Sequence, residues 1–294
     1  MLTGPNVKSR WSCLVIGLLV SSMPVAHPDL VLQIEKISRQ ISLTPSNADL
    51  YLKRGDLYRR HKDWLNAARD FEKVREIEPE QAQIDWYEGR LEVDAGHWAE
   101  GDRLLSRYLA SNEKFSSAYH TRAWARWQLE RPEAAAHDYA SSILYSERPA
   151  PTLYRSLVIT QFASGGDLLS ESAATVDTGL QRFPGEVSLL GLGVDLALAD
   201  ANADRAAQYL STLSPGLSKL PQWTFRQAVL SCIQGDMESA VAGFMSLQPE
   251  AGNRADNRAG SWTVSLEMIE QLVIKADLQS CREAVLKSLT ALQP

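Results

Sequence analysis

The stretch ADLYLKRGDLYRRHKDWLNAARDFEKVREIEP, Ala48–Pro79, decides the fold of this chain. Apolar and small residues recur in it every three or four positions, which is the period of one helix face. Tyr51, Gly55 and Tyr58 share one face of a first helix, and a second apolar stripe follows after a break at residues 61–63. A large side chain at Gly55 would push two crossing helices apart. The stretch therefore predicts a pair of closely packed antiparallel helices.

The same stretch resembles a tetratricopeptide repeat position by position. The matching residues are Tyr51 in place of the usual Trp, Arg54 in place of the usual Leu, Gly55, Tyr58, Ala67, Phe71 and Pro79. A shift of 34 residues places Gly89 on Gly55 and Trp98 on Trp64, and a further shift reaches Ala123. The resemblance implies an all-α, right-handed superhelical solenoid of stacked antiparallel helix pairs. It also implies that the first helices line a concave inner face.

Four segments follow from the rhythm of helices and breaks. Residues 1–26 are a predicted signal peptide, 27–45 an N-terminal capping helix, 46–149 three repeats, and 150–294 degenerate repeats. A helix pair cannot bury its apolar face alone, so stacked neighbours must make one continuous core. Extended runs of alternating residues, which would predict strands, are nearly absent.

The first 26 residues have the pattern of an export signal. Lys8 and Arg10 precede a run of ten apolar residues, Trp11–Val20, and small residues lead to Ala26. Ten helical residues rise about 15 Å, which is half the hydrocarbon core of a bilayer. We therefore expect cleavage near Ala26, no membrane span afterwards, and a periplasmic or secreted protein. The alternative is a protein anchored to the membrane by an uncleaved signal.

The overall charge argues against one class of partner. The net charge is -6, and a protein that binds nucleic acid through phosphate contacts would be basic. The local basic run at residues 53–62 spreads around the solvated side of its helix. We therefore expect a protein or peptide partner and no nucleic acid.

The sequence contains three cysteines, and it leaves open whether two of them form a disulfide. Cys13 lies in the predicted signal peptide, so Cys232 and Cys281 remain in an exported chain. Both lie in apolar helical patterns, which favours buried, unpaired thiols. An oxidising compartment also permits a disulfide between them.

No motif predicts catalysis, a cofactor or a metal. The sequence contains no HExxH, GxSxG, phosphate-binding glycine loop or CxxC. The five histidines never pair at the i, i+4 spacing of a helical zinc site. The favoured function is therefore a non-catalytic scaffold. The alternatives are an enzyme with an unrecognised metal site or a divergent C-terminal helical domain, and a structural or self-associating envelope component.

The inner face predicted from the resemblance is rich in tryptophan and arginine, the residue types that anchor protein interfaces. Its candidate partner-binding residues are Arg59, Trp86, Arg90, His120, Trp124, Trp127 and Arg155. The competing interpretation is that the three tryptophan rings fill space between neighbouring helices. Both interpretations stay open at the level of sequence.

Overall fold

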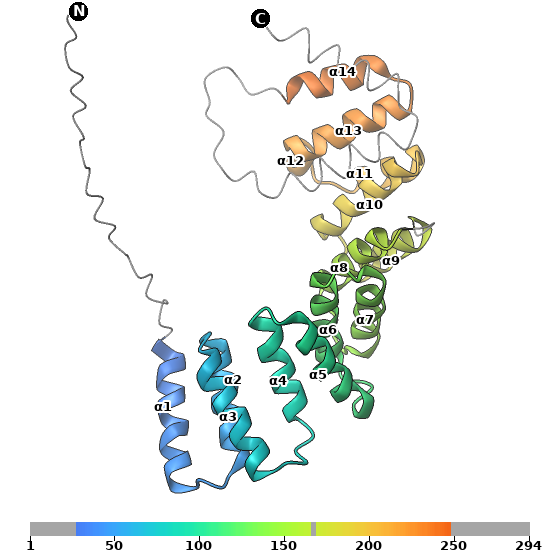
Figure 1. Ribbon diagram of the computed structural model, residues 1–294. Coiled ribbons are helices and arrows are strands. Elements are labelled where there is room, and N and C mark those ends of the chain that lie inside the picture. Colours follow the sequence, from blue (N-terminus) through green and yellow to red (C-terminus); the bar gives the residue numbers. More distant parts are fainter. Residues whose placement is uncertain (1–27, 166–168, 248–294) are drawn as a thin grey trace, which may run out of the picture. The chain divides into compact units, whose positions relative to one another are not determined.

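The computed structural model describes residues 28–165 and 169–247, and α-helices are the only regular secondary structure in these ranges (Figure 1). It falls into two units that are described separately. Unit 1 contains α1 (Pro28–Leu43), α2 (Ala48–Arg60) and α3 (Trp64–Ile77). Unit 2 contains α4 (Ile84–Asp94), α5 (Trp98–Ser111), α6 (Ser116–Gln128), α7 (Pro132–Tyr145), α8 (Pro151–Ala163), α9 (Leu169–Arg182), α10 (Val187–Ala199), α11 (Ala203–Ser211), α12 (Pro215–Ser218), α13 (Pro221–Ile233) and α14 (Met237–Ser246).

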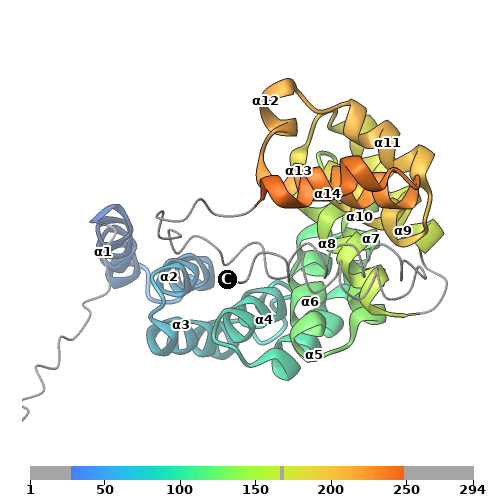
Figure 2. The ribbon, with the colours of Figure 1, turned by 90° about the horizontal axis from the view of Figure 1, so that it is seen from above.

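Consecutive helices pair and stack within each unit. The helix pairs α2–α3, α4–α5, α6–α7, α8–α9, α10–α11 and α13–α14 each pack face to face. Both α5 and α7 also contact the first helix of the following pair, and α13 lies beside α14 in both views (Figures 1 and 2). The predicted all-α architecture of stacked antiparallel pairs is confirmed. The right-handed superhelix remains a prediction.

Local chemistry sets the helix ends. The Asn47 side chain accepts a hydrogen bond from the Asp49 amide at 3.1 Å and caps α2, as the sequence predicts. Pro132, Pro151 and Pro221 occupy the first turn of α7, α8 and α13. Proline is tolerated there because a first-turn amide has no partner within the helix.

One backbone device recurs in the turn of every helix pair. A residue with positive φ follows each first helix: Lys62, Gly96, Glu130, Gly165, Ala201 and Gly235. In five of these turns the next amide bonds back to a carbonyl five residues earlier, as Asp63 does to Tyr58. This is the bond of a Schellman helix end. The repeat geometry therefore continues in the described residues 150–165 and 169–247, where the sequence pattern is weak.

Small residues let the paired helices approach closely. Phe71 of α3 is fully buried, and its ring occupies the space that a side chain at Gly55 would need. In α6 and α7, Ala123 and Ala135 are both fully buried in the cluster that also holds Tyr139. The positions that match the repeat pattern are thus the positions where helices touch.

Two matching polar clamps tie three successive helices together. Arg54 of α2 donates to both carboxylate oxygens of Asp70 on α3, at 2.8 and 2.6 Å, and to Ser38 on α1 at 3.0 Å. Arg122 of α6 repeats this arrangement. It bonds Asp138 on α7 at 2.8 and 2.7 Å and Ser106 on α5 at 3.0 Å. Bidentate arginine–carboxylate pairs fix orientation as well as distance, so α6 is held against both of its neighbours.

The structure adds one helix to those predicted and contradicts one interpretation of the sequence. The short helix α12 lies in the connection between α11 and α13, for which the sequence analysis makes no prediction. Cys232 is disulfide-bonded, so the favoured unpaired thiol is wrong at this position. Cys281, the predicted signal peptide and the predicted helices within residues 262–292 lie outside the described residues.

Candidate functional site

Two of the three candidate tryptophans pack against the core of unit 2. The Trp86 ring on α4 meets Phe115 edge to face at 5.1 Å and tilts toward Tyr108 at 6.1 Å. The Arg90 guanidinium covers it at 4.9 Å from the ring centroid. Trp127 on α6 packs against the cluster around Ala123 and Leu157. Packing therefore accounts for much of the surface of both rings.

Trp124 differs from the other two. It is 46% exposed, although it lies on α6 next to the fully buried Ala123 and Ala125. Exposed tryptophan is a large apolar area left in water, and such residues are typical anchors of protein interfaces. His120 lies one turn earlier on the same face of α6 and also keeps contact with solvent.

The next first helix repeats this arrangement. Arg155 and Ile159 are the fifth and ninth residues of α8, as His120 and Trp124 are of α6. Arg155 is exposed and Ile159 is 37% exposed. Residues of α6, α7 and α8 share one hydrophobic cluster, and α7 packs against both α6 and α8. We call His120, Trp124, Arg155 and Ile159 the α6–α8 stripe.

The stripe ends at α10. The fifth and ninth residues of that helix are Gly191 and Asp195, and Asp195 is only 2% exposed. Arg226 of α13 donates to both Asp195 oxygens, at 2.7 and 2.6 Å, and its guanidinium lies over Gly191. Burial raises the pKa of Asp195, while the hydrogen bonds from Arg226 oppose that effect. On α10, the buried Asp195–Arg226 pair therefore occupies the positions that are exposed on α6 and α8.

Arg59 of unit 1 is placed differently from the other candidates. Only 8% of the residue is exposed, and its Nε donates to Asp56 Oδ1 at 2.9 Å. The Arg59 side chain is therefore hydrogen-bonded within α2 and largely buried.

The environment of His120 gives it a perturbed ionisation. Its ring centroid lies 6.0 Å from that of Tyr139, which is itself 3% exposed. Desolvation by these neighbours lowers the pKa of His120 below its usual value. The stripe therefore carries a neutral imidazole at neutral pH, and its positive charge comes from Arg155.

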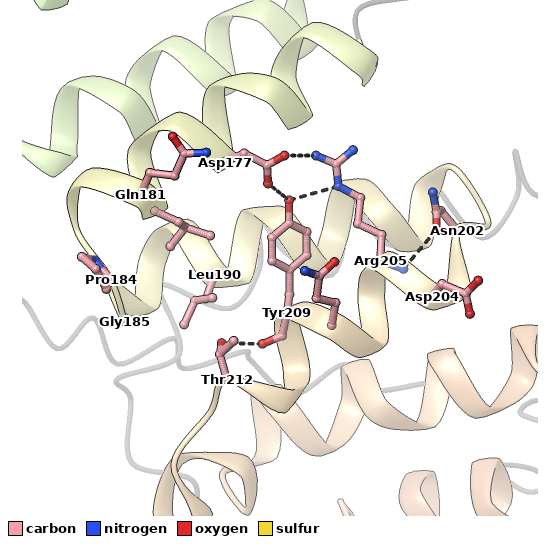
Figure 3. Close-up of a pocket in the computed structure, with 12 residues that line it drawn as sticks. Asp177, Gln181, Pro184, Gly185, Leu190, Asn202, Asp204, Arg205, Tyr209 and Thr212 are labelled. Carbon is pink, nitrogen blue, oxygen red and sulfur yellow. Dashed lines mark hydrogen bonds and ion pairs between the residues drawn. The ribbon is translucent and has the colours of Figure 1, made fainter.

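A second surface is a groove of about 970 Å³ between α9, α10 and α11 (Figure 3). Leu180, Leu190 and Pro184 contribute apolar atoms, and Gln181 and Gln208 contribute amides. These residues come mostly from second helices, so sequence reasoning based on the first-helix face missed them.

A hydrogen-bonded triad fixes one side of this groove. Tyr209 donates to Asp177 Oδ1 at 2.5 Å, and Arg205 donates to the Tyr209 oxygen at 3.1 Å and to Asp177 Oδ2 at 2.5 Å. Burial raises the pKa of Tyr209 to about 12, and its bond to Asp177 adds to this effect. A protonated phenol that already donates to a carboxylate is a poor general base at neutral pH. The triad thus joins α9 to α11.

Within residues 28–165 and 169–247, His, Cys, Asp and Glu side chains form no group of three or more that could hold a metal ion. No helix in the same ranges has the length and apolar character needed to cross a membrane.

Comparison with known proteins identifies the fold. No protein-family model matches the sequence, and no curated protein matches it. Solved structures do match. The type IV pilus biogenesis factor PilW superposes with a TM-score of 0.53 and 20% identity, over 69% of this chain and 91% of PilW. This chain has the tetratricopeptide-repeat fold.

Two further tetratricopeptide-repeat structures agree. YrrB, described as having an unusual peptide-binding site, matches with a TM-score of 0.52 and 14% identity, over 71% of this chain and 97% of YrrB. PilF of Pseudomonas aeruginosa matches with a TM-score of 0.51 and 15% identity, over 76% and 96%. At these identities the likeness concerns the tetratricopeptide-repeat fold alone.

Proposed function

We propose that this tetratricopeptide-repeat chain is an exported, non-catalytic scaffold that binds a segment of another protein through the α6–α8 stripe. The observation that carries the proposal is the exposure of Trp124 and Ile159 at the same position of successive first helices. A solenoid hides most of its large apolar side chains between helices, so two exposed ones in register favour an intermolecular role.

The chemistry of the stripe favours a particular kind of segment. Trp124 and Ile159 offer apolar contact, and Arg155 offers a positive charge one turn before Ile159. A segment with one or two apolar side chains near a carboxylate would match both features. The clamps around Arg122 hold α6 in place, so binding would require little reorganisation of the scaffold.

Two features support a non-catalytic role. Asp177, Arg205 and Tyr209 of the α9–α11 groove are hydrogen-bonded to one another, and the sequence contains none of the catalytic motifs named in the sequence analysis. The alternative of an enzyme predicts a stoichiometric metal in the purified chain, which elemental analysis would detect. The alternative of a self-associating component predicts a mass that falls on dilution.

The binding test uses peptides selected on the full chain from a random display library. Their affinities for the wild type, Trp124→Ala, Ile159→Ala and Leu144→Ala would be compared by fluorescence anisotropy. Leu144 is 72% exposed on the second helix α7 and serves as the matched control. We expect at least a tenfold loss for the two stripe variants and none for the control, with unchanged circular dichroism. Equal affinity for all four proteins would refute the proposed surface.

A further inference from the structure

The α9–α11 groove has two walls that are joined to each other without any ligand. Asp177 of α9 accepts hydrogen bonds from Arg205 and Tyr209 of α11, and Arg205 also donates to the Ala173 carbonyl of α9 at 3.3 Å. The groove volume of about 970 Å³ lies within the usual range of ligand sites, about 300–1,000 Å³. Because its walls are already fixed, the groove would need little reorganisation to accept a ligand.

Three polar side chains of the groove take no part in this bonding. Gln181 on α9 and Gln208 on α11 line opposite walls, and both are exposed. Asp204, the second residue of α11, is also exposed and lies near Asn202 at one end of the groove (Figure 3). Within the described part of the chain, the side chains of Gln181, Gln208 and Asp204 make no hydrogen bond or ion pair. These groups are therefore available to a ligand.

The lining of the groove carries one net negative charge. Of its two carboxylates, Asp177 pairs with Arg205 at 2.5 Å, and Asp204 has no such partner in the described ranges. Tyr209 adds no charge at neutral pH, because burial raises its pKa to about 12. The α6–α8 stripe has the opposite sign, since its charge comes from Arg155.

We infer that the α9–α11 groove is a second binding site, which takes a short extended segment of a partner protein with a basic side chain next to an aliphatic one. The Asp204 carboxylate provides charge complementarity to a Lys or Arg of the segment. Leu180, Leu190 and Pro184 offer apolar contact to the neighbouring aliphatic side chain.

The two free amides favour an extended segment over a helical one. A glutamine side chain can donate and accept hydrogen bonds at the same time. Gln181 and Gln208 could therefore each bond both an N–H and a C=O group of a peptide backbone. An extended segment presents these groups along its length, whereas a helix uses most of them internally.

This inference goes beyond the proposed function and does not rest on it. The stripe lies on the first helices α6 and α8 and favours a segment with a carboxylate. The groove is formed mainly by the second helices α9 and α11 and favours a basic segment. With both surfaces, the scaffold would join two segments of opposite charge.

A peptide selection tests the charge preference of the groove. A random heptapeptide display library would be selected in parallel on the full wild-type chain, Asp204→Lys and Glu238→Lys. Glu238 is the matched control, because it is exposed and is the second residue of α14, as Asp204 is of α11. We expect peptides with Lys or Arg beside an aliphatic residue to be enriched at least tenfold on the wild type and Glu238→Lys, and not on Asp204→Lys. Equal enrichment on all three proteins, or none on the wild type, would overturn the inference.

Affinities of one selected basic peptide then distinguish the groove from the stripe. Fluorescence anisotropy would compare the wild type, Gln208→Ala, Gln40→Ala and Trp124→Ala, each with an unchanged circular dichroism spectrum. Gln40 is exposed on α1 and serves as the amide control. We expect about a fivefold loss for Gln208→Ala, as for the loss of one hydrogen bond, and none for the other two variants. Unchanged affinity in Gln208→Ala would overturn the second site. If Trp124→Ala showed the loss instead, the peptide would bind the stripe, and the proposed function would stand without the groove.

Discussion

Removal of the Asp138 carboxylate is the sharpest test of how unit 2 is held together. Its side chain is fully buried and accepts two hydrogen bonds from Arg122, and Arg126 approaches the same carboxylate at 3.0 Å. Asp138→Ala would leave the Arg122 guanidinium, only 11% exposed, without its counter-charge. Breaking a buried ion pair by removing one partner costs about 3–5 kcal/mol. We expect a loss of this size in the free energy of unfolding.

The measurement is urea denaturation of the full chain, followed by far-ultraviolet circular dichroism. Glu100→Ala is the control, because its pair with Arg103 is about half exposed at both ends, and exposed pairs contribute little. Arg122→Leu with Asp138→Leu is the second comparison. Replacing a whole buried ion pair with apolar residues often leaves stability unchanged. In the double variant, Arg126 would still have its hydrogen bond to Asp102, which measures 2.9 Å in the wild type. The double variant should therefore lose less stability than Asp138→Ala alone. A loss below about 1 kcal/mol for Asp138→Ala, or a larger loss in the double variant, would refute this reasoning.

Three further predictions concern packing, protonation and export. Gly55→Ala should destabilise unit 1 by about 1–3 kcal/mol in the same denaturation assay, because its Cβ would overlap the Phe71 ring, whereas Gly216→Ala, with open space around it, should not. His120 has a folded pKa below its unfolded value of about 6.5, so the unfolded chain takes up the proton first and stability falls as pH drops from 6.5 toward the folded pKa. His120→Gln should remove that part of the pH dependence of the unfolding midpoint, and an unchanged slope would contradict it. Expression of the full sequence in a bacterial host should yield an exported chain that begins at His27. Detection of an intact, membrane-bound chain by mass spectrometry would contradict cleavage and favour the uncleaved anchor.

The sequence predicted the repeat fold because small and large residues are constrained where helices touch. Gly55 and Phe71 are in contact in the structure, so their spacing was informative. Beyond residue 150 the sequence pattern of small and large residues is weaker, because the side chains at the helix contacts vary. The backbone turn persists there, with positive φ at Ala201 and Gly235. Many combinations of apolar side chains can fill the interface between two helices, whereas only a few backbone conformations can connect them in a short turn.

The polar clamps and the candidate surface were harder to predict. Ser38, Arg54 and Asp70 are spaced by 16 residues, and Ser106, Arg122 and Asp138 repeat that spacing. This signal is present in the sequence, but only a known helix pairing gives it meaning. Likewise, one helical face carries Trp124 and Trp127 three positions apart, and the neighbouring helices decide which ring is covered. Periodicity alone does not contain that information.

The almost complete burial of α10 limits the length of segment that the proposed binding surface could hold. Nine of its thirteen residues are buried, so it offers an approaching ligand very little side-chain surface. The open stretch then has the width of two helices, or about 20 Å at the usual helix diameter. An extended chain advances about 3.3 Å per residue, so roughly six residues span that width. A recognition motif of this length would be read by a few side chains, and affinity would be tuned at one or two of its positions.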